Sequence, residues 1–141
     1  MAASILIVDD NALYRESLHR LLKSCYPHVC LTIVSDGSAA LQMLRQRPFD
    51  LLMLDYQLPG LSGGDVVRRM RGSGQLIAHA LPVIVLMSTQ PDVSIFARSL
   101  GVAFLPKPCS AYDLEQLLDP LMASTTGPAE VSRRLWRIQL R

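Results

Sequence analysis

Four short apolar runs are spread along this chain of 141 residues, and none of them alternates with polar residues. Runs of this kind are typical of strands buried on both faces, as in a parallel sheet with helices on each side. They cover residues 4–8, 51–54, 83–87 and 102–105. Parallel strands need long crossover connections, which are usually helical. The pattern therefore favours an α/β fold.

Segments with helical periodicity separate these runs. Tyr14, Leu18 and Leu22 recur at helical spacing after Asn11, a residue type that often caps a helix N-terminus. Further helices are expected to begin near Asp36, Gly63, Pro91 and Ser110. Residues 29–34 supply one more strand. Five strands alternating with five helices predict a three-layer sandwich with right-handed crossovers.

Polar residues follow the ends of the apolar runs. Asp9 and Asp10 follow the first run, Asp55 the second and Ser88 the third, while Lys107 comes shortly after the fourth. Ligands of open α/β sheets bind beyond the carboxyl ends of the strands, so these side chains are expected to meet at one edge. The acidic pair and Asp55 become neighbours if the strand order is 2-1-3-4-5. The sequence therefore predicts a flavodoxin-like, doubly wound five-stranded sheet.

The residue types at this edge indicate a metal and a phosphoryl group. Three converging carboxylates repel one another, and a bound cation relieves that repulsion. Oxygen ligands without Cys or His favour a hard ion, and Mg²⁺ keeps several water molecules that substrate oxygens can replace. Phosphoryl transfer depends mainly on positioning and charge neutralisation, which Lys107 and Ser88 could supply. Asp55 lies between the acidic pair and these two residues, so it is the candidate nucleophile.

Composition limits the other possibilities. With 50% hydrophobic residues, 18% charged residues and a net charge of +2, the chain suits one compact domain. Its three cysteines show no CxxC spacing, which indicates reduced, buried thiols in a cytoplasmic protein. No apolar run approaches the ~18 residues of a membrane span, and the N-terminus lacks a secretory pattern. No membrane partner is therefore expected.

Four segments together resemble the receiver domain of response regulators in bacterial two-component systems. They are ILIVDDN at 5–11, DLLMLDYQLPGLSG at 50–63, VLMS at 85–88 and FLPKP at 104–108. The resemblance implies that Asp55 accepts a phosphoryl group from the phosphohistidine of a sensor histidine kinase or a phosphotransfer protein. It also implies a Mg²⁺ bound by Asp10, Asp55 and the backbone carbonyl of Gln57, with Asp9 acting largely through water.

The same resemblance implies functions for further residues, and it also shows where this sequence differs from most receivers. It assigns Ser88 and Lys107 to the phosphoryl oxygens and Phe104 to an aromatic switch position, and it implies a cis Lys107–Pro108 bond. Ser88 stands where receivers more often have Thr, and Thr89 follows where a small residue is usual. The span from Ser88 to Lys107 is also a few residues shorter than receivers usually show. An unusual fourth helix, or unusual loops around it, is therefore expected.

Other protein classes match the residues less well. A haloacid-dehalogenase-like phosphatase needs a DxD pattern after the first strand, where this chain has Asp9-Asp10. A dinucleotide-binding module needs a G-x-G-x-x-G turn there. Two alternatives stay open: a receiver-like interaction module without phosphoryl turnover, and the N-terminal part of a longer regulator with a DNA-binding or enzymatic output domain.

The resemblance covers residues 4 to about 123, so residues 1–123 are expected to form the receiver unit. Residues 124–141 are expected to form a linker and a basic amphipathic tail, with Val131, Leu135 and Ile138 on its apolar face. These eighteen or so residues are too few for a helix-turn-helix domain. We therefore expect no direct nucleic-acid binding and no enzymatic activity beyond assistance to the domain's own phosphorylation and dephosphorylation. Homodimer formation stays open.

Overall fold

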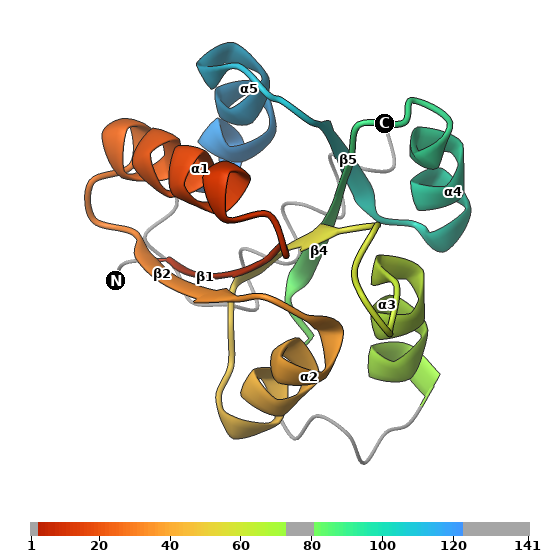
Figure 1. Cartoon of the computed structure of the whole chain (residues 1–141). Helices are drawn as coiled ribbons and strands as arrows, with labels where there is room; N and C mark the ends of the chain where they lie inside the picture. The colour runs from red at the N-terminus through yellow and green to blue at the C-terminus, as the bar shows by residue number, and fades with distance from the viewer. Residues whose placement is uncertain (1–2, 73–80, 123–141) are drawn as a thin grey trace.

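The computed structural model describes residues 3–72 and 81–122, within which five strands alternate with five helices (Figure 1). The strands are β1 (Ser4–Val8), β2 (Cys30–Val34), β3 (Leu51–Asp55), β4 (Val83–Ser88) and β5 (Ala103–Pro106). The helices are α1 (Ala12–Cys25), α2 (Gly37–Gln46), α3 (Gly63–Gly72), α4 (Val93–Leu100) and α5 (Ala111–Met122). The expected tail at 124–141 lies outside the described residues.

All five strands run parallel in one sheet of order β2-β1-β3-β4-β5, which confirms the predicted flavodoxin-like topology. Helices α1 and α5 cover one face, and α2, α3 and α4 cover the other (Figure 1). β1 and β3 are adjacent, and the chain leaves β1 toward one side of the sheet and β3 toward the other. This reversal is where open α/β sheets bind their ligands.

The strand register brings the predicted site residues level with one another. Val8 of β1 pairs with Leu54 of β3, and Asp55 pairs with Met87 of β4. Asp9 follows Val8 directly, so it lies level with Asp55. β4 ends one residue beyond Met87. The carboxyl ends of the three central strands therefore finish together.

Successive side chains of a central strand enter two different cores. Ile5 and Ile7 pack with residues of α1 and α5, whereas Leu6 and Val8 pack with residues of α2, α3 and α4. All four side chains are fully buried. Because both faces of the strand are covered, neither set of alternate positions faces water. This is the physical reason for the apolar runs without alternation.

Polar side chains cap the helix N-termini. Asn11 accepts a hydrogen bond from the backbone N–H of Tyr14 at 3.1 Å, and Asp36 caps α2 in the same way. α3 begins with a reciprocal pair, in which the Ser62 hydroxyl and the Asp65 carboxylate each accept from the other residue's N–H at 3.1 Å. α5 begins with a similar pair. The predicted starts of these four helices are confirmed.

α4, with eight residues, is the shortest of the five helices, and the expectation of an unusual fourth helix or unusual loops around it stays a prediction. Asp92 stands at its N-cap without a side-chain capping hydrogen bond. Phe96 of α4 meets Tyr56 edge to face, with ring centroids 5.2 Å apart. The Arg68 guanidinium of α3 lies 5.4 Å from the Phe96 centroid. Phe96 of α4 therefore contacts both α3 and the residue that follows β3.

The expectation that the cysteines are buried is wrong for Cys30. This residue is exposed because β2 is an edge strand that pairs only with β1. Cys25 and Cys109 are partly buried, and all three thiols are free. Within the described residues, no helix is long and apolar enough to cross a membrane.

Candidate functional site

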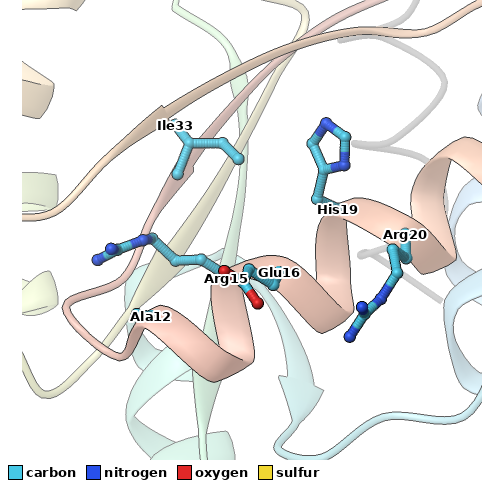
Figure 2. A pocket seen from close by; sticks show the side chains of 6 residues that line it. All are labelled: Ala12, Arg15, Glu16, His19, Arg20 and Ile33. Atoms are coloured by element: carbon cyan, nitrogen blue, oxygen red, sulfur yellow. The ribbon is translucent and has the colours of Figure 1, made fainter.

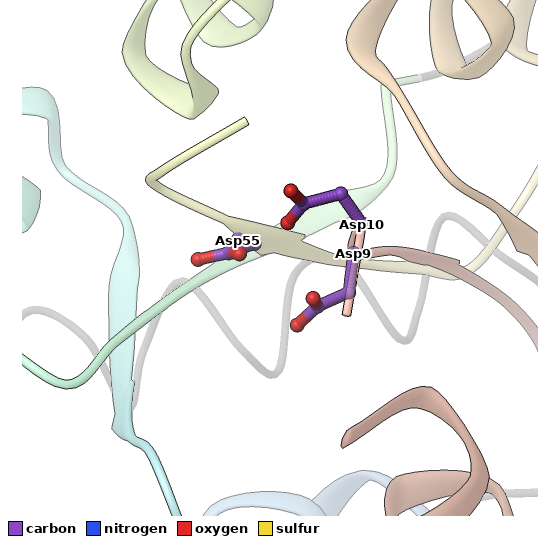
Figure 3. Close-up of side chains that lie close together, drawn as sticks. All are labelled: Asp9, Asp10 and Asp55. Atoms are coloured by element: carbon purple, nitrogen blue, oxygen red, sulfur yellow. The ribbon is translucent and has the colours of Figure 1, made fainter. Parts of the chain in front are cut away.

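The three predicted aspartates meet where β1 and β3 end (Figure 3). One carboxylate oxygen from each of Asp9, Asp10 and Asp55 lies within 4.8 Å of the other two. Asp9 and Asp55 are buried, whereas Asp10 is exposed. Carboxylate oxygens at this spacing suit a hard divalent cation that keeps water molecules on its open side.

Lys107 brings the opposite charge to the same edge. Its Nζ atom lies 2.8 Å from Asp9 Oδ2 and 3.2 Å from Asp55 Oδ2. The backbone N–H of Lys107 donates a hydrogen bond to the carbonyl of Ser88 at 2.9 Å, which joins the loop after β5 to the end of β4. The Lys107–Pro108 peptide bond is cis, as predicted. The ammonium group therefore bridges two buried carboxylates.

The surroundings of Asp55 disfavour its charged form. Burial raises the pKa of this carboxyl, and the neighbouring charge of Asp9 raises it further. The Lys107 ammonium and the backbone N–H of Gln57, which is 3.2 Å from Asp55 Oδ1, lower the pKa without cancelling the rise. Additional positive charge at this edge would therefore stabilise the Asp55 carboxylate.

Ser88 is buried at the end of β4, and its Oγ atom accepts a hydrogen bond from the backbone N–H of Gln90 at 3.0 Å. A hydroxyl that accepts one hydrogen bond still has its proton to donate. Thr89, next to it, is exposed. Phe104 is half-buried against the core beneath α2, α3 and α4. The functions assigned to Ser88, Phe104 and the carbonyl of Gln57 stay predictions.

The start of α1 supports the site in a way that the sequence pattern did not reveal. Nζ of Lys107 lies 4.3 Å from the centroid of the Tyr14 ring. The backbone N–H of Asn11 donates to Asp9 Oδ1 at 2.8 Å, and the Arg15 guanidinium donates to the Asp9 carbonyl at 2.8 Å. Burial raises the pKa of the Tyr14 phenol, so it keeps its proton. Helical spacing assigned Tyr14 only to the core.

A shallow pocket lies between α1 and the edge strand β2 (Figure 2). It has a volume of about 380 Å³ and is lined by Ala12, Arg15, Glu16, His19, Arg20 and Ile33. None of the predicted site residues lines it. Because Arg15 lines the pocket and also donates to the Asp9 carbonyl, the pocket lies beside the acidic edge and not in it.

A doubly wound sheet whose edge combines three carboxylates, a buried hydroxyl and a lysine defines a receiver-type signalling domain. The sequence profile of the response regulator receiver domain matches residues 5–119. The chain belongs to this family, which confirms the resemblance seen in the sequence.

Known members of the family differ in length. Response regulator MprA from Mycobacterium tuberculosis (strain H37Rv) is 36% identical over 126 residues, which are 87% of this chain and 50% of MprA. Chemotaxis protein CheY from Pseudomonas aeruginosa is 31% identical over 124 residues, which are 87% of this chain and 98% of CheY. The chain therefore spans about half the length of MprA and nearly all of CheY.

A solved structure shares the fold. It is the receiver domain of sensor histidine kinase PA1611 from Pseudomonas aeruginosa, which has a magnesium ion coordinated in its active site cleft. The two structures give a TM-score of 0.71 at 23% identity, covering 88% of this chain and 100% of that domain.

Proposed function

We propose that this receiver domain accepts a phosphoryl group on Asp55 from a phosphohistidine of a sensor histidine kinase or a histidine phosphotransfer protein. The observation that carries the proposal is the Lys107 ammonium, 3.2 Å from Asp55 Oδ2 at an edge where three carboxylates converge. An ammonium at that distance can neutralise negative charge on the oxygens of a phosphoryl group that is transferred to Asp55.

In the proposed step, a carboxylate oxygen of Asp55 attacks the phosphorus atom. An O–P bond forms, and the P–N bond of the phosphohistidine breaks with its electron pair going to the imidazole nitrogen. Lys107 and the Ser88 hydroxyl bind phosphoryl oxygens, and Asp55 becomes an acyl phosphate. In the reverse half of the cycle, water attacks the phosphorus atom, the bond between phosphorus and the Asp55 oxygen breaks, and inorganic phosphate leaves. The same side chains would assist this dephosphorylation.

The donor set fits Mg²⁺. Asp10, Asp55 and the backbone carbonyl of Gln57 would bind the ion, and Asp9 would act on it through water. The carboxylates supply only oxygen ligands, which suits a hard cation. Bound there, the ion would neutralise charge on the phosphoryl oxygens. The magnesium ion in the PA1611 receiver domain, which shares this fold, supports the same choice.

A labelling experiment tests the assignment. The protein is incubated with Mg²⁺ and a small acyl phosphate donor, and the intact mass is measured for the wild type, Asp55→Asn and Asp92→Asn. Asp92 is an exposed aspartate without a side-chain capping hydrogen bond, so it serves as the control. The wild type and Asp92→Asn should each gain one phosphoryl group, and Asp55→Asn should gain none.

Two results would contradict the proposal. Undiminished labelling of Asp55→Asn would place the phosphoryl group on another residue. A wild type that stays unlabelled by the acyl phosphate and by phosphorylated histidine phosphotransfer proteins would favour the alternative, a receiver-like interaction module without phosphoryl turnover.

The output of the domain is also a proposal. We propose residues 1–123 as the receiver unit and 124–141 as a linker with a basic amphipathic tail. Phosphorylation, with Phe104 as the switch aromatic, would change contacts with a downstream protein or a second copy of the chain in the cytoplasm, without direct binding to nucleic acid or membrane. Light scattering before and after phosphorylation distinguishes a homodimer from a monomer that binds another partner.

A further inference from the structure

Tyr14 is an aromatic residue beside the acidic edge to which the proposed chemistry gives no function. Nζ of Lys107 lies 4.3 Å from the centroid of its ring. This is well inside the separation of about 6 Å within which a cation is attracted to the face of an aromatic ring. The side chain of Lys107 is only 10% exposed, so water screens that attraction weakly. Lys107 therefore interacts with Asp9, Asp55 and the Tyr14 ring.

Tyr14 is held at its backbone and at its phenol oxygen. The backbone N–H of Tyr14 donates to the Asn11 side chain at 3.1 Å, and the backbone N–H of Asn11 donates to Asp9 Oδ1 at 2.8 Å. The phenol oxygen contacts the sulfur of Met87 on β4 at 3.8 Å. Since Asp9 Oδ2 binds Lys107, the contacts form a closed circuit from Asp9 through Asn11 and Tyr14 to the ammonium. A side chain held in this way can hold Lys107 in turn.

The charge of the site explains why an uncharged neighbour suits Lys107. The edge has three carboxylates against one ammonium, and the incoming phosphoryl group is itself anionic. A further carboxylate beside Lys107 would repel that group. An aromatic face attracts the ammonium without adding a negative charge.

We propose that Tyr14 is a positioning residue that keeps the Lys107 ammonium directed at Asp55 during phosphoryl transfer. This inference rests on the proposed function. Tyr14 contacts no reacting atom in the scheme; it acts through Lys107. The aromatic ring, and not the phenol hydroxyl, carries the effect.

Rates of Asp55 phosphorylation test the inference. With saturating Mg²⁺ and a small acyl phosphate, Tyr14→Leu should slow phosphorylation by about two- to thirtyfold, the range that a cation–ring contact of ordinary strength predicts. Tyr14→Phe keeps the ring and should keep most of the rate. Leu13→Ala is the control, because this neighbouring side chain is largely exposed and should leave the rate unchanged. A loss in Tyr14→Phe equal to that in Tyr14→Leu would overturn the inference.

A second comparison, made in a protein that already carries Lys107→Ala, distinguishes positioning of Lys107 by Tyr14 from a general effect of Tyr14 on the fold. In Lys107→Ala there is no ammonium to position, so adding Tyr14→Leu should slow the residual reaction no further. An equal additional loss in that background would show that Tyr14 acts independently of Lys107 and would overturn the inference.

Unfolding experiments make the contact testable without phosphorylation. Urea midpoints are measured for the wild type, Tyr14→Leu, Lys107→Ala and the double variant, all unphosphorylated. The free energy of unfolding should fall less in the double variant than the sum of the decreases in the two single variants, because the contact between Tyr14 and Lys107 can be lost only once. If the decrease in the double variant equalled that sum, the contact would be refuted. An unlabelled wild type that still shows the coupling would instead refute the proposed function and leave the contact established.

Discussion

Gly63, the first residue of α3, lies against the end of the strand that carries Asp55. A Cβ atom at this position would meet the carbonyl oxygen of Asp55 at 2.5 Å and the Cα atom of Tyr56 at 2.9 Å. Real Cβ contacts are essentially never shorter than 3.0 Å, so the backbone would have to move by about half an ångström. β3 is hydrogen-bonded to β1 on one side and β4 on the other, which opposes that movement.

Gly63→Ala should therefore lower the free energy of unfolding. A helical Ala is favoured over Gly by up to about 1 kcal/mol, whereas overpacking costs roughly 1–3 kcal/mol. Since the contact is with backbone atoms, we expect the upper end of that cost and a net loss of about 2 kcal/mol. Gly64→Ala should lose less, because its Cβ would meet the Phe96 ring at 3.0 Å and a side chain can turn away.

Gly72→Ala is the matched control in the same helix, because none of the described residues has an atom within 4 Å of a Cβ there. Urea unfolding followed by circular dichroism should rank Gly72→Ala at or above the wild type, Gly64→Ala below it and Gly63→Ala lowest. If Gly63→Ala were as stable as Gly72→Ala, the close approach of α3 to β3 would be refuted. Gly63→Ala should also slow phosphorylation, since the shift displaces the backbone of Asp55.

Asp55→Asn should raise the free energy of unfolding at neutral pH, because burial and then the Asp9 charge raise the pKa of Asp55 and make its charged form costly. In urea titrations with EDTA, this gain should shrink as pH falls toward 3.8, where the wild-type carboxyl has taken up its proton; a loss of stability at neutral pH would contradict the expectation. Asp65→Asn should do the opposite, because hydrogen bonds with Ser62 lower the pKa of Asp65 and its carboxylate stabilises the fold above pH 3.8. The loss of stability in Asp65→Asn should disappear as pH falls through the lowered pKa that Asp65 has in the folded state. If Asp65→Asn were as stable as the wild type at neutral pH, the expectation would be contradicted. Asn11→Ala removes the cap of α1 and should lower the free energy of unfolding by about 1 kcal/mol, measured by thermal unfolding. Asn11→Asp, which keeps a capping oxygen, should retain most of that stability.

The fold was predictable because burial on two faces leaves a direct trace in the sequence. Runs such as residues 51–54 and 83–87 could hardly be anything but central strands, and helical segments between them required crossovers. The carboxyl-end rule then brought Asp9, Asp55 and Lys107 together from positions far apart in the chain, and the structure has them within hydrogen-bond distance.

Other features depend on geometry that a linear pattern does not contain. Cys30 lies in an apolar segment, but its strand is at the edge of the sheet, so the thiol is exposed. Tyr14 has the spacing of a core residue, and only the turn from β1 into α1 brings its ring over Lys107. The close approach of Gly63 to β3 is likewise a property of packing. In each case the outcome depends on how the elements pack against one another.

Because Asp55 is buried, its charge acts over a longer distance than the charge of an exposed side chain. Its carboxylate stands at the last residue of a strand that is buried throughout, at the boundary between the dry interior and water. On the inner side of that boundary the local dielectric constant is low and mobile ions do not enter, so a change of charge there decays slowly with distance. The end of β4 lies on the inner side of that boundary, since Met87 and Ser88 are both buried, whereas exposed charges on the outer surfaces of the helices are shielded by salt. A signal that begins as added charge on Asp55 should therefore pass to β4 with little dependence on ionic strength, while contacts between exposed charges and a partner protein should weaken as salt is added.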